Sequence, residues 1–319
     1  MVMKMNNLYV EDISNGELAS TIYDIAFFSA GYEERCLEVP STVHNQQAKH
    51  VVILEYNEHK EDNTRKDVDL FYRTYWREAK RVEKSHSDAS EIYHEILRAI
   101  AIRPKGEVFR VLVDYTSMSR VWYSSIISIL LQHLDIAICI DFTYTNGYYQ
   151  DVNLNVELGS LKVIPGCEGS ALTKKNTAAI FMLGFDRNGP HRLYNIINPS
   201  KSYGVLASPA ASHEYVGKCI DENRLFIEHQ LGGEKNILHL PINSLSICYE
   251  QLLQVVNPLL NDYNVTIVPF GPKPHILASV LCGMTNRNVT CMYSEYIRRN
   301  TSRVESRGEV TISRVHKLA

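Results

Sequence analysis

Short apolar segments alternate with amphipathic segments along the first half of the chain. The short segments lack polar alternation, which is typical of strands buried on both faces. These expected strands occupy 24–28, 50–54, 108–113 and 136–143. Apolar residues at helical spacing predict helices, and these occupy 67–84, 90–102 and 119–134. The alternation of strands and helices predicts an α/β fold with a parallel, doubly wound sheet and right-handed crossovers.

The second half follows the same alternation. Its expected strands occupy 178–183, 203–207, 237–240, 264–268 and 289–293. Its expected helices occupy 212–226, 243–261 and 274–285. The segments that end each half, 152–164 and 309–315, look more like antiparallel ribbons, because polar alternation returns there. The strand at 237–240 has no expected counterpart in the first half, where 85–89 is polar.

Three segments of the first half recur in the same order in the second half. Each matched pair is an apolar strand, and two of the three pairs run into similar loops. The matched positions are Gly31 and Gly184, Val113 and Val268, and Tyr144 and Tyr293, at offsets between 149 and 155 residues. A nearly constant offset indicates an internal duplication. We therefore expect two tandem Rossmann-like halves, doubly wound and mainly parallel, over residues 1–168 and 169–319.

Composition places the chain among ordinary globular proteins. Of 319 residues, 45% are hydrophobic and 22% are charged, which excludes a disordered or fibrous chain. The net charge of −3 gives no overall attraction to nucleic acid or to an anionic membrane. The charge is uneven, because residues 1–160 hold 16 basic and 24 acidic side chains whereas the remainder holds 17 and 12.

Seven scattered cysteines form no C-x-x-C pair and no zinc-finger spacing. The N-terminus lacks the pattern of a secretory signal, so we expect a cytoplasmic chain with reduced thiols. The longest apolar stretch, 121–140, contains polar residues and does not read as a membrane span. Cys36 follows Arg35 at an expected helix start, where a thiol pKa can fall, but a buried thiol is the default reading. We expect no bound metal and no cofactor.

The loop after the first strand is the first candidate for ligand binding. Ligands of open α/β sheets bind beyond the carboxyl ends of the strands, where the strand order reverses. Gly31 permits close approach of a ligand, and the helix expected after it offers N–H groups to an anion. The alternative is a tight turn in which Glu33 and Glu34 complement the helix dipole. The candidate ligand-binding residues are Ser29, Gly31, Glu34 and Arg35.

The loop after the fourth strand places an acid, hydroxyl groups and an arginine directly before an apolar helix. Hydroxyl and N–H groups at a helix start can hold phosphate or ribose, and an arginine can add a bidentate contact. The alternative is that a hydroxyl caps the helix while the acid bonds nearby N–H groups. The two readings are compatible with each other. The candidate residues are Asp114, Thr116, Ser117, Ser119 and Arg120.

The equivalent loops of the second half carry cations as well. Residues 269–275 combine a turn stiffened by prolines with a lysine at a helix start, and the alternative is a rigid turn with a solvated lysine. Residues 184–192 offer arginines and a histidine, and an ordinary flexible loop is the alternative. The candidate ligand-binding residues are Gly184, Asp186, Arg187, Gly271, Lys273 and His275.

Two features outside these loops have a common structural explanation and a less common functional one. Tyrosines flank Asn146-Gly147 and can stack a base, but a hairpin turn at Asn146-Gly147 is the commoner meaning. The tail from Arg287 holds seven basic residues against three acids. Such a run is usually a solvated face, and the alternative of an anionic partner such as nucleic acid stays open.

The loops resemble those of CARF sensor domains and of their tandem single-chain relatives, the SAVED domains of prokaryotic antiviral defence. In that family the later loop typically reads Gly-Gly-Thr-Lys before an apolar helix. Gly271 and Lys273 approach this pattern in one half, Thr116 and Arg120 in the other, and the Gly-Gly pair is missing from both. The resemblance implies binding of a cyclic oligonucleotide second messenger between the two halves. Because no residues remain for a fused effector, it also implies a separate effector protein or a domain that degrades its own ligand.

Three functions follow from these patterns. The first is a nucleotide-binding sensor or regulatory subunit of bacterial antiviral defence, which takes a phosphate-containing ligand. The second is a nucleotide-processing hydrolase, a phosphodiesterase or a glycoside-cleaving enzyme, with Asp114 or Glu33 as acid–base. The third is a non-catalytic scaffold whose loops merely cap helices. The chain contains no H-E-x-x-H, G-x-S-x-G or Walker pattern.

Overall fold

The chain forms two compact units. The computed structural model describes residues 8–58, 60–149, 156–169, 175–298 and 304–318. Unit 1 comprises residues 1–150 and 303–319, and unit 2 comprises residues 151–302. This division differs from the expected boundary after residue 168, because 151–168 belongs to unit 2 and the C-terminal segment belongs to unit 1.

Unit 1 is built on a seven-stranded sheet with the order β1-β13-β6-β5-β2-β3-β4. Its strands are β1 (Leu8–Asp12), β2 (Ile25–Ala30), β3 (Val51–Tyr56), β4 (Lys80–Lys84), β5 (Phe109–Asp114), β6 (Ile138–Tyr149) and β13 (Val304–Lys317). The strands from β2 to β6 are parallel, whereas β13 runs antiparallel to both β6 and β1.

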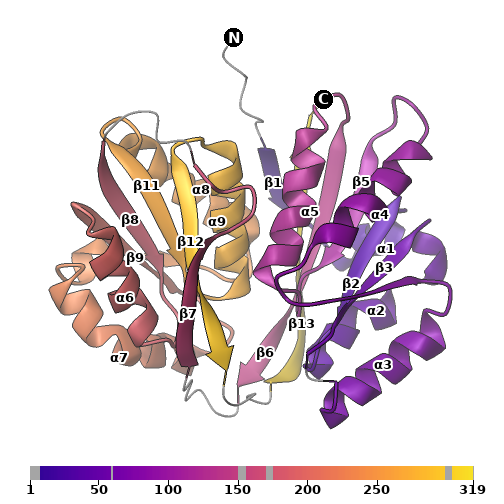
Figure 1. Cartoon of the computed structure of the whole chain (residues 1–319), viewed down its shortest axis with the longest axis horizontal. Helices are drawn as coiled ribbons and strands as arrows, with labels where there is room; N and C mark the ends of the chain where they lie inside the picture. Colours follow the sequence, from indigo (N-terminus) through magenta and orange to yellow (C-terminus); the bar gives the residue numbers. More distant parts are fainter. Residues whose placement is uncertain (1–7, 59, 150–155, 170–174, 299–303, 319) are drawn as a thin grey trace. The chain divides into compact units, whose positions relative to one another are not determined.

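Helices cover both faces of this sheet (Figure 1). They are α1 (Asn15–Ser20), η1 (Glu34–Leu37), α2 (Glu38–Thr42), η2 (Asn45–Gln47), α3 (Asn63–Tyr75), α4 (Ser90–Ala101) and α5 (Arg120–Gln132). Ala26 and Phe28 of β2 share a core with Val39 of α2 and Tyr72 of α3. Because strand side chains alternate, Phe27 points to the opposite face, where α4 and α5 pack together. Burial on both faces explains why these strands read as unbroken apolar runs.

Unit 2 repeats this design around a sheet with the order β10-β9-β8-β11-β12-β7. Its strands are β7 (Val156–Val163), β8 (Asn176–Met182), β9 (Lys201–Ala207), β10 (Ile237–Leu240), β11 (Tyr263–Pro269) and β12 (Val289–Arg298). Its helices are α6 (Asn188–Ile197), α7 (His213–His229), η3 (Glu234–Asn236), α8 (Leu245–Leu259) and α9 (Lys273–Thr285). Side chains of α6 and α7 share a core with β8, while α8 packs on α9.

The parallel strands follow one order in both units, which confirms the expected pair of Rossmann-like halves. Read across the sheet, β6-β5-β2-β3-β4 corresponds to β12-β11-β8-β9-β10. The antiparallel strand beside this set is exchanged between the units. β7 follows β6 in the chain but pairs with β12, and β13 follows β12 but pairs with β6. The expected ribbons at the ends of the halves therefore exist, but each completes the sheet of the other unit.

The expected helix over 67–84 is wrong in its last part. The helix α3 ends at Tyr75, and β4 at Lys80–Lys84 is the counterpart of β10 that the sequence did not reveal. β4 is an edge strand in which only Val82 is buried, so it lacks the apolar run by which the other strands were recognised.

Two segments expected to be turns or loops are regular structure. Asn146-Gly147 lies inside β6, where Gly147 pairs with Ser306 of β13, so it is not a hairpin turn. Much of the expected loop 184–192 belongs to α6, which begins at Asn188. No helix within the described part of the chain is long and apolar enough to cross a membrane.

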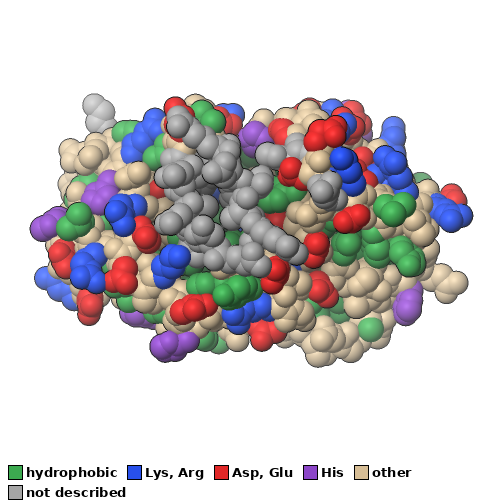
Figure 2. Space-filling view, turned by 90° about the horizontal axis from the view of Figure 1, so that it is seen from below, with side chains coloured by type: hydrophobic (Ala, Val, Ile, Leu, Met, Phe, Trp, Pro, Cys, Tyr) green, Lys and Arg blue, Asp and Glu red, His purple; other side chains and the backbone are tan. Residues whose placement is uncertain are grey.

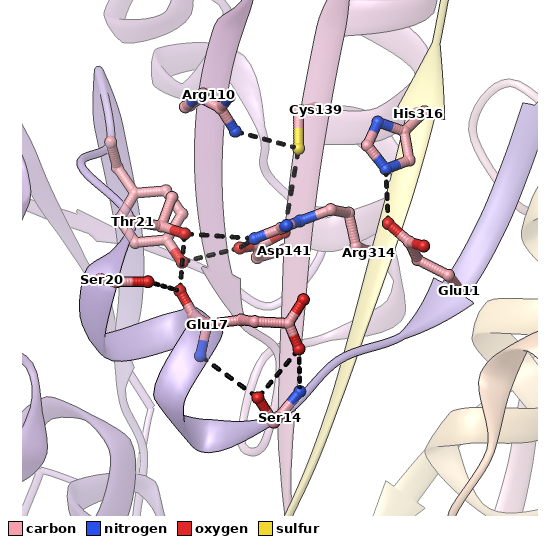
Figure 3. Close-up of polar contacts among 11 residues, drawn as sticks. Glu11, Ser14, Glu17, Ser20, Thr21, Arg110, Cys139, Asp141, Arg314 and His316 are labelled. Atoms are coloured by element: carbon pink, nitrogen blue, oxygen red, sulfur yellow. Dashed lines mark hydrogen bonds and ion pairs between the residues drawn. The ribbon is translucent and has the colours of Figure 1, made fainter.

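A buried ion pair fastens the returning strand β13 to unit 1 (Figure 3). Arg314 donates from Nε to Oδ1 of Asp141 at 2.7 Å and from Nη2 to Oδ2 at 2.8 Å. The same guanidinium donates to Thr21 Oγ1 at 3.2 Å, and Tyr23 OH donates to Asp141 Oδ2 at 2.7 Å. Burial, followed by the charge of Asp141, raises the pKa of Tyr23 far above its usual value. The phenol therefore stays a donor to a carboxylate that is itself fully buried.

Replacement of Arg314 by Ala should destabilise unit 1 strongly. The change leaves the buried Asp141 carboxylate without its cation, and removal of one partner of a buried pair costs about 3–5 kcal/mol. Urea unfolding followed by circular dichroism measures the free energy of unfolding. The control is Arg307→Ala, an exposed arginine of the same strand, which should change stability by no more than about 0.5 kcal/mol. Equal losses in the two variants would contradict the anchoring role of the pair.

Candidate functional site

The two candidate loops of unit 1 lie side by side at the carboxyl edge of its sheet. β2 and β5 are neighbours, and the strand order reverses between them. The Oγ atoms of Ser29, in β2, and of Ser117, after β5, are 2.7 Å apart. A β-carbon added to Gly31 would lie 2.9 Å from the Ser117 side chain, so this position needs glycine for the close approach. The expected proximity of the two loops is therefore present.

Internal hydrogen bonds shape the loop after β5. Asp114 is buried and accepts from Thr116 N at 3.2 Å and from Thr116 Oγ1 at 2.5 Å. Thr116 Oγ1 in turn accepts from the backbone N–H of Thr145 in β6 at 3.0 Å. Ser119 caps α5 by accepting from Trp122 N at 3.2 Å. Capping and side chain–backbone bonding, the structural alternatives for this loop, are thus present, and Arg120 begins the helix as a partly exposed cation.

Arg35 lies in the interior of unit 1. Its guanidinium pairs with Glu33 at 2.7 Å and donates to Tyr144 OH at 3.0 Å and to the Thr145 carbonyl at 2.9 Å. Burial alone would lower the pKa of Arg35, but the charges of Glu33 and the neighbouring tyrosines raise it well above its usual value. Through these contacts Arg35 links the loop after β2 to the last part of β6. Glu34, beside it, is exposed.

Cys36 is a buried thiol, as expected for a cysteine without a reactive environment. Burial is the largest effect on its pKa, which rises to about 12, although the Gly31 backbone and Ser117 act in the opposite direction. The neutral thiol is the form present near neutral pH, so Cys36 lacks the thiolate of a reactive cysteine.

Two aromatic residues that the sequence analysis did not single out support this edge. Tyr56, the last residue of β3, donates from its hydroxyl to the Ser117 carbonyl at 2.7 Å. Its ring stacks on Trp122 of α5 with the ring centroids 4.2 Å apart. A tyrosine at the carboxyl end of the second strand could have been noticed, because that strand end lies on the same edge as the candidate loops.

A glutamate and a histidine that the sequence analysis missed also lie at this edge. Glu58 follows β3 and His86 follows β4, and Glu58 Oε1 lies 3.0 Å from His86 Nδ1. The pair was missed because β4 was expected to be helix. A residue just after a parallel strand is expected at the carboxyl edge of the sheet, where ligands bind. A residue just after a helix carries no such expectation.

The equivalent loops of unit 2 also meet. A β-carbon on Gly184 would clash with the Phe270 carbonyl oxygen and would lie 3.5 Å from the α-carbon of Gly271. Lys273 is the first residue of α9 and is partly exposed. Unit 2 thus places a glycine-lined turn and a cation at the carboxyl edge between β8 and β11, as unit 1 does between β2 and β5.

The other expected ligand residues of unit 2 are engaged within the fold. His275 is fully buried, and its Nε2 lies 3.1 Å from the Leu240 carbonyl and 3.2 Å from that of Pro241. Asp186 is buried, and its Oδ1 accepts from the N–H groups of Asn188 and Gly189 at the start of α6. Arg187 is exposed and pairs with Glu222 of α7 at 3.1 Å.

The basic C-terminal tail is partly internal. Arg314 holds Asp141, and Lys317 is buried with its Nζ donating to the carbonyls of His133 and Ile136 at 2.6 and 2.8 Å. Arg299 and Arg303 lie outside the described residues. Figure 2 shows acidic and basic side chains interspersed on the face that it presents. Among the described residues, no group of three His, Cys, Asp or Glu is arranged to hold a metal ion.

Comparison of the chain with models of known protein families gave no match, and comparison with curated protein sequences gave none either. The resemblance to CARF and SAVED domains stays an expectation that rests on the loop sequences.

Introduction of a methyl group at Gly184 should separate the two loops of unit 2. The added β-carbon would lie 3.2 Å from the Phe270 carbonyl carbon and still nearer its oxygen, and such overpacking costs about 1–3 kcal/mol. Thermal unfolding of Gly184→Ala measures this loss. Gly217 of α7 is the control, since a β-carbon there meets no atom within 4 Å. Gly217→Ala should stabilise the helix by about 0.5–1 kcal/mol.

Acid should weaken the chain through His275. Full burial lowers the pKa of His275 to about 4, although the bonds to the Pro241 and Leu240 carbonyls oppose this shift. The unfolded histidine takes up its proton near pH 6.5, so stability falls as the pH drops from that value toward 4. Between about pH 7.5 and about pH 5 the loss from this group is about 2 kcal/mol. Urea titrations at both values should show a pH dependence that is smaller by this amount in His275→Gln, and an unchanged pH dependence would contradict the assignment.

Proposed function

We propose that the chain binds a phosphate-containing nucleotide at the carboxyl edges of its sheets. It then serves as a sensor or regulatory subunit of bacterial antiviral defence, acting through a separate effector protein. One observation carries the binding proposal. The 2.7 Å contact between Ser29 and Ser117 brings two polar loops together at the point where the strand order reverses, which is where open α/β sheets take their ligands.

The start of α5 has the features of a phosphate site. A helix of 13 residues carries partial positive charge at its N-terminus, and an anion is stabilised there. Arg120 adds a full positive charge at the same end, and a guanidinium can bind phosphate with two parallel hydrogen bonds. The hydroxyls of Ser117 and Ser119 lie close to it in the chain and can donate to the same phosphate group.

Unit 2 supports the proposal by repetition. Lys273 is the first residue of α9, as Arg120 is the first residue of α5. The helix α5 follows β5, which pairs with β2, and α9 follows β11, which pairs with β8. Two unrelated loops that merely cap helices have no reason to share a cation at this position.

Both candidate catalytic acids, Glu33 and Asp114, bind other side chains of unit 1. Glu33 pairs with Arg35, and Asp114 accepts from Thr116 inside the sheet edge. A carboxylate held in this way stabilises the loop rather than exchanging protons with a ligand. The geometry therefore favours binding over a hydrolase that would use either of these two residues.

Arg120→Ala and Lys273→Ala should weaken nucleotide binding without unfolding the chain. Loss of one charge-assisted hydrogen bond costs about 1.5–3 kcal/mol, which is about a tenfold to hundredfold rise in Kd. Calorimetric titration with cyclic di-AMP, a cyclic tri-adenylate, ATP and AMP measures the affinity. Lys105→Ala is the matched control, because Lys105 is an exposed cation before β5, at the amino edge of the sheet.

Thermal unfolding of the same variants separates binding from folding. Each variant should unfold close to the wild-type temperature. A loss of stability with unchanged affinity for every nucleotide of the panel would make both residues structural and would favour the scaffold function. Failure of the wild-type chain to bind any of the nucleotides would contradict the proposal itself.

A further inference from the structure

Glu58 and His86 form a hydrogen-bonded pair at the carboxyl ends of two neighbouring parallel strands. The ladder of β3 and β4 continues to Asn57, whose N–H donates to the Lys84 carbonyl at 3.1 Å. One residue further along, Glu58 Oε1 accepts from His86 Nδ1 at 3.0 Å and from the His86 backbone N–H at 3.4 Å. The strand register thus places the carboxylate and the imidazole together at the sheet edge.

The pair is tied to the loop of the proposed nucleotide site. Trp122 Nε1 donates to the carbonyls of Ser85 and Asp88, on either side of His86 in the chain, at 3.2 and 2.9 Å. Tyr56, two residues before Glu58, stacks on Trp122 and bonds the Ser117 carbonyl. Trp122 and Tyr56 therefore connect both strand ends to the start of α5.

The arrangement resembles the orientation of a general base by a carboxylate. Burial raises the pKa of Glu58, but hydrogen bonds from His86 and the backbone outweigh it and keep the pKa below its usual value. An ionised carboxylate can only accept a hydrogen bond, so Nδ1 of His86 is the donor. In the neutral imidazole Nε2 then carries the lone pair, and Nε2 has no hydrogen-bond partner among the described residues. The His86 side chain is 55% exposed, which leaves the imidazole open to a ligand. Glu58 Oε2 is buried and also has no hydrogen-bond partner in the described part of the chain.

We propose that His86 is the catalytic residue and Glu58 its positioning residue in hydrolysis of a phosphoester bond of the nucleotide held at this edge. This inference rests on the proposed nucleotide binding. His86 Nε2 takes a proton from water while the water oxygen bonds to phosphorus. The bond from phosphorus to the leaving oxygen breaks, and the imidazolium returns the proton to that oxygen. Atoms and charge balance without an oxidant or a reductant.

A second histidine–glutamate pair offers a matched control. His50 Nε2 lies 2.9 Å from Glu95 Oε2. His50 immediately precedes β3, whereas Glu58 follows it, so the two pairs lie at opposite edges of one sheet. Only the pair at the carboxyl edge is connected to the α5 loop, and only that pair is expected to take part in catalysis.

The experiment measures turnover and binding separately. Wild type, His86→Ala, Glu58→Gln and His50→Gln are incubated with cyclic di-AMP, a cyclic tri-adenylate, ATP, AMP and bis(para-nitrophenyl) phosphate, and products are followed by chromatography or absorbance. His86→Ala should lower kcat at least about a hundredfold, with nucleotide affinity and thermal stability unchanged. Glu58→Gln should lower kcat at least about tenfold with little effect on KM. Added imidazole should restore part of the activity of His86→Ala, which a purely structural role would not permit.

Three outcomes would overturn the inference. A nucleotide that binds to the wild-type chain but is not cleaved would refute catalysis and leave nucleotide binding intact. Equal turnover by His86→Ala and His50→Gln would show that His86 takes no part in the reaction. Absence of both binding and cleavage would refute this inference together with the proposed function. Hydrolysis of bis(para-nitrophenyl) phosphate that depends on His86, without binding of any nucleotide, would support the acid–base pair and contradict the nucleotide proposal.

Discussion

The pairing of β13 with β6 is the constraint on which unit 1 depends. β6 would otherwise end the parallel set with an open edge, and it is the longest strand beside the candidate site. Taking Asp141 and Arg314 out of water costs free energy. The bidentate geometry and the added donor from Tyr23 offset that cost. Since this pair joins a strand of the first half to the C-terminal strand, unit 1 is complete only when the chain returns to it.

The order of the strands then determines where chemistry is possible. β2 and β5 are paired in parallel, so their carboxyl ends lie at the same edge of the sheet. The loops that leave them are held by buried polar contacts, of which Arg35 to Thr145 and Thr116 to Thr145 are the clearest. Such contacts keep a site in one geometry before a ligand arrives, which reduces the entropy lost on binding. Buried polar side chains here hold the two loops in place.

The two units share an architecture and differ in their chemistry. Unit 1 carries hydroxyl side chains at its carboxyl edge, together with Glu58 and His86. Unit 2 has Pro272 and Pro274 at the corresponding helix start, and its buried His275 contacts the carbonyls of Leu240, the last residue of β10, and of Pro241. The two copies of a duplicated chain can keep one fold while their edge residues diverge, because the core maintains the fold and only a few residues make up each sheet edge.

Periodicity alone determined the strands that are buried on both faces, several of the helices that cover them and the duplication, because burial on both faces leaves an unbroken apolar run in the sequence. It did not reveal α2 or α6. The loops after β2 and β5 could likewise be identified as neighbours from the general rule for open α/β sheets. Only the tertiary structure decided what lies at a sheet edge or depends on distant pairing. β4 is polar because it lies at the edge of the sheet, so its sequence reads as the end of a helix and hides His86, the partner of Glu58. The exchange of β7 and β13 depends on partners about 130 or more residues away in the chain. The buried positions of Arg35 and His275 depend on the carbonyls that their side chains contact. Sequence periodicity reports the environment of a segment, whereas the identity of its neighbours is set by packing across the whole sheet.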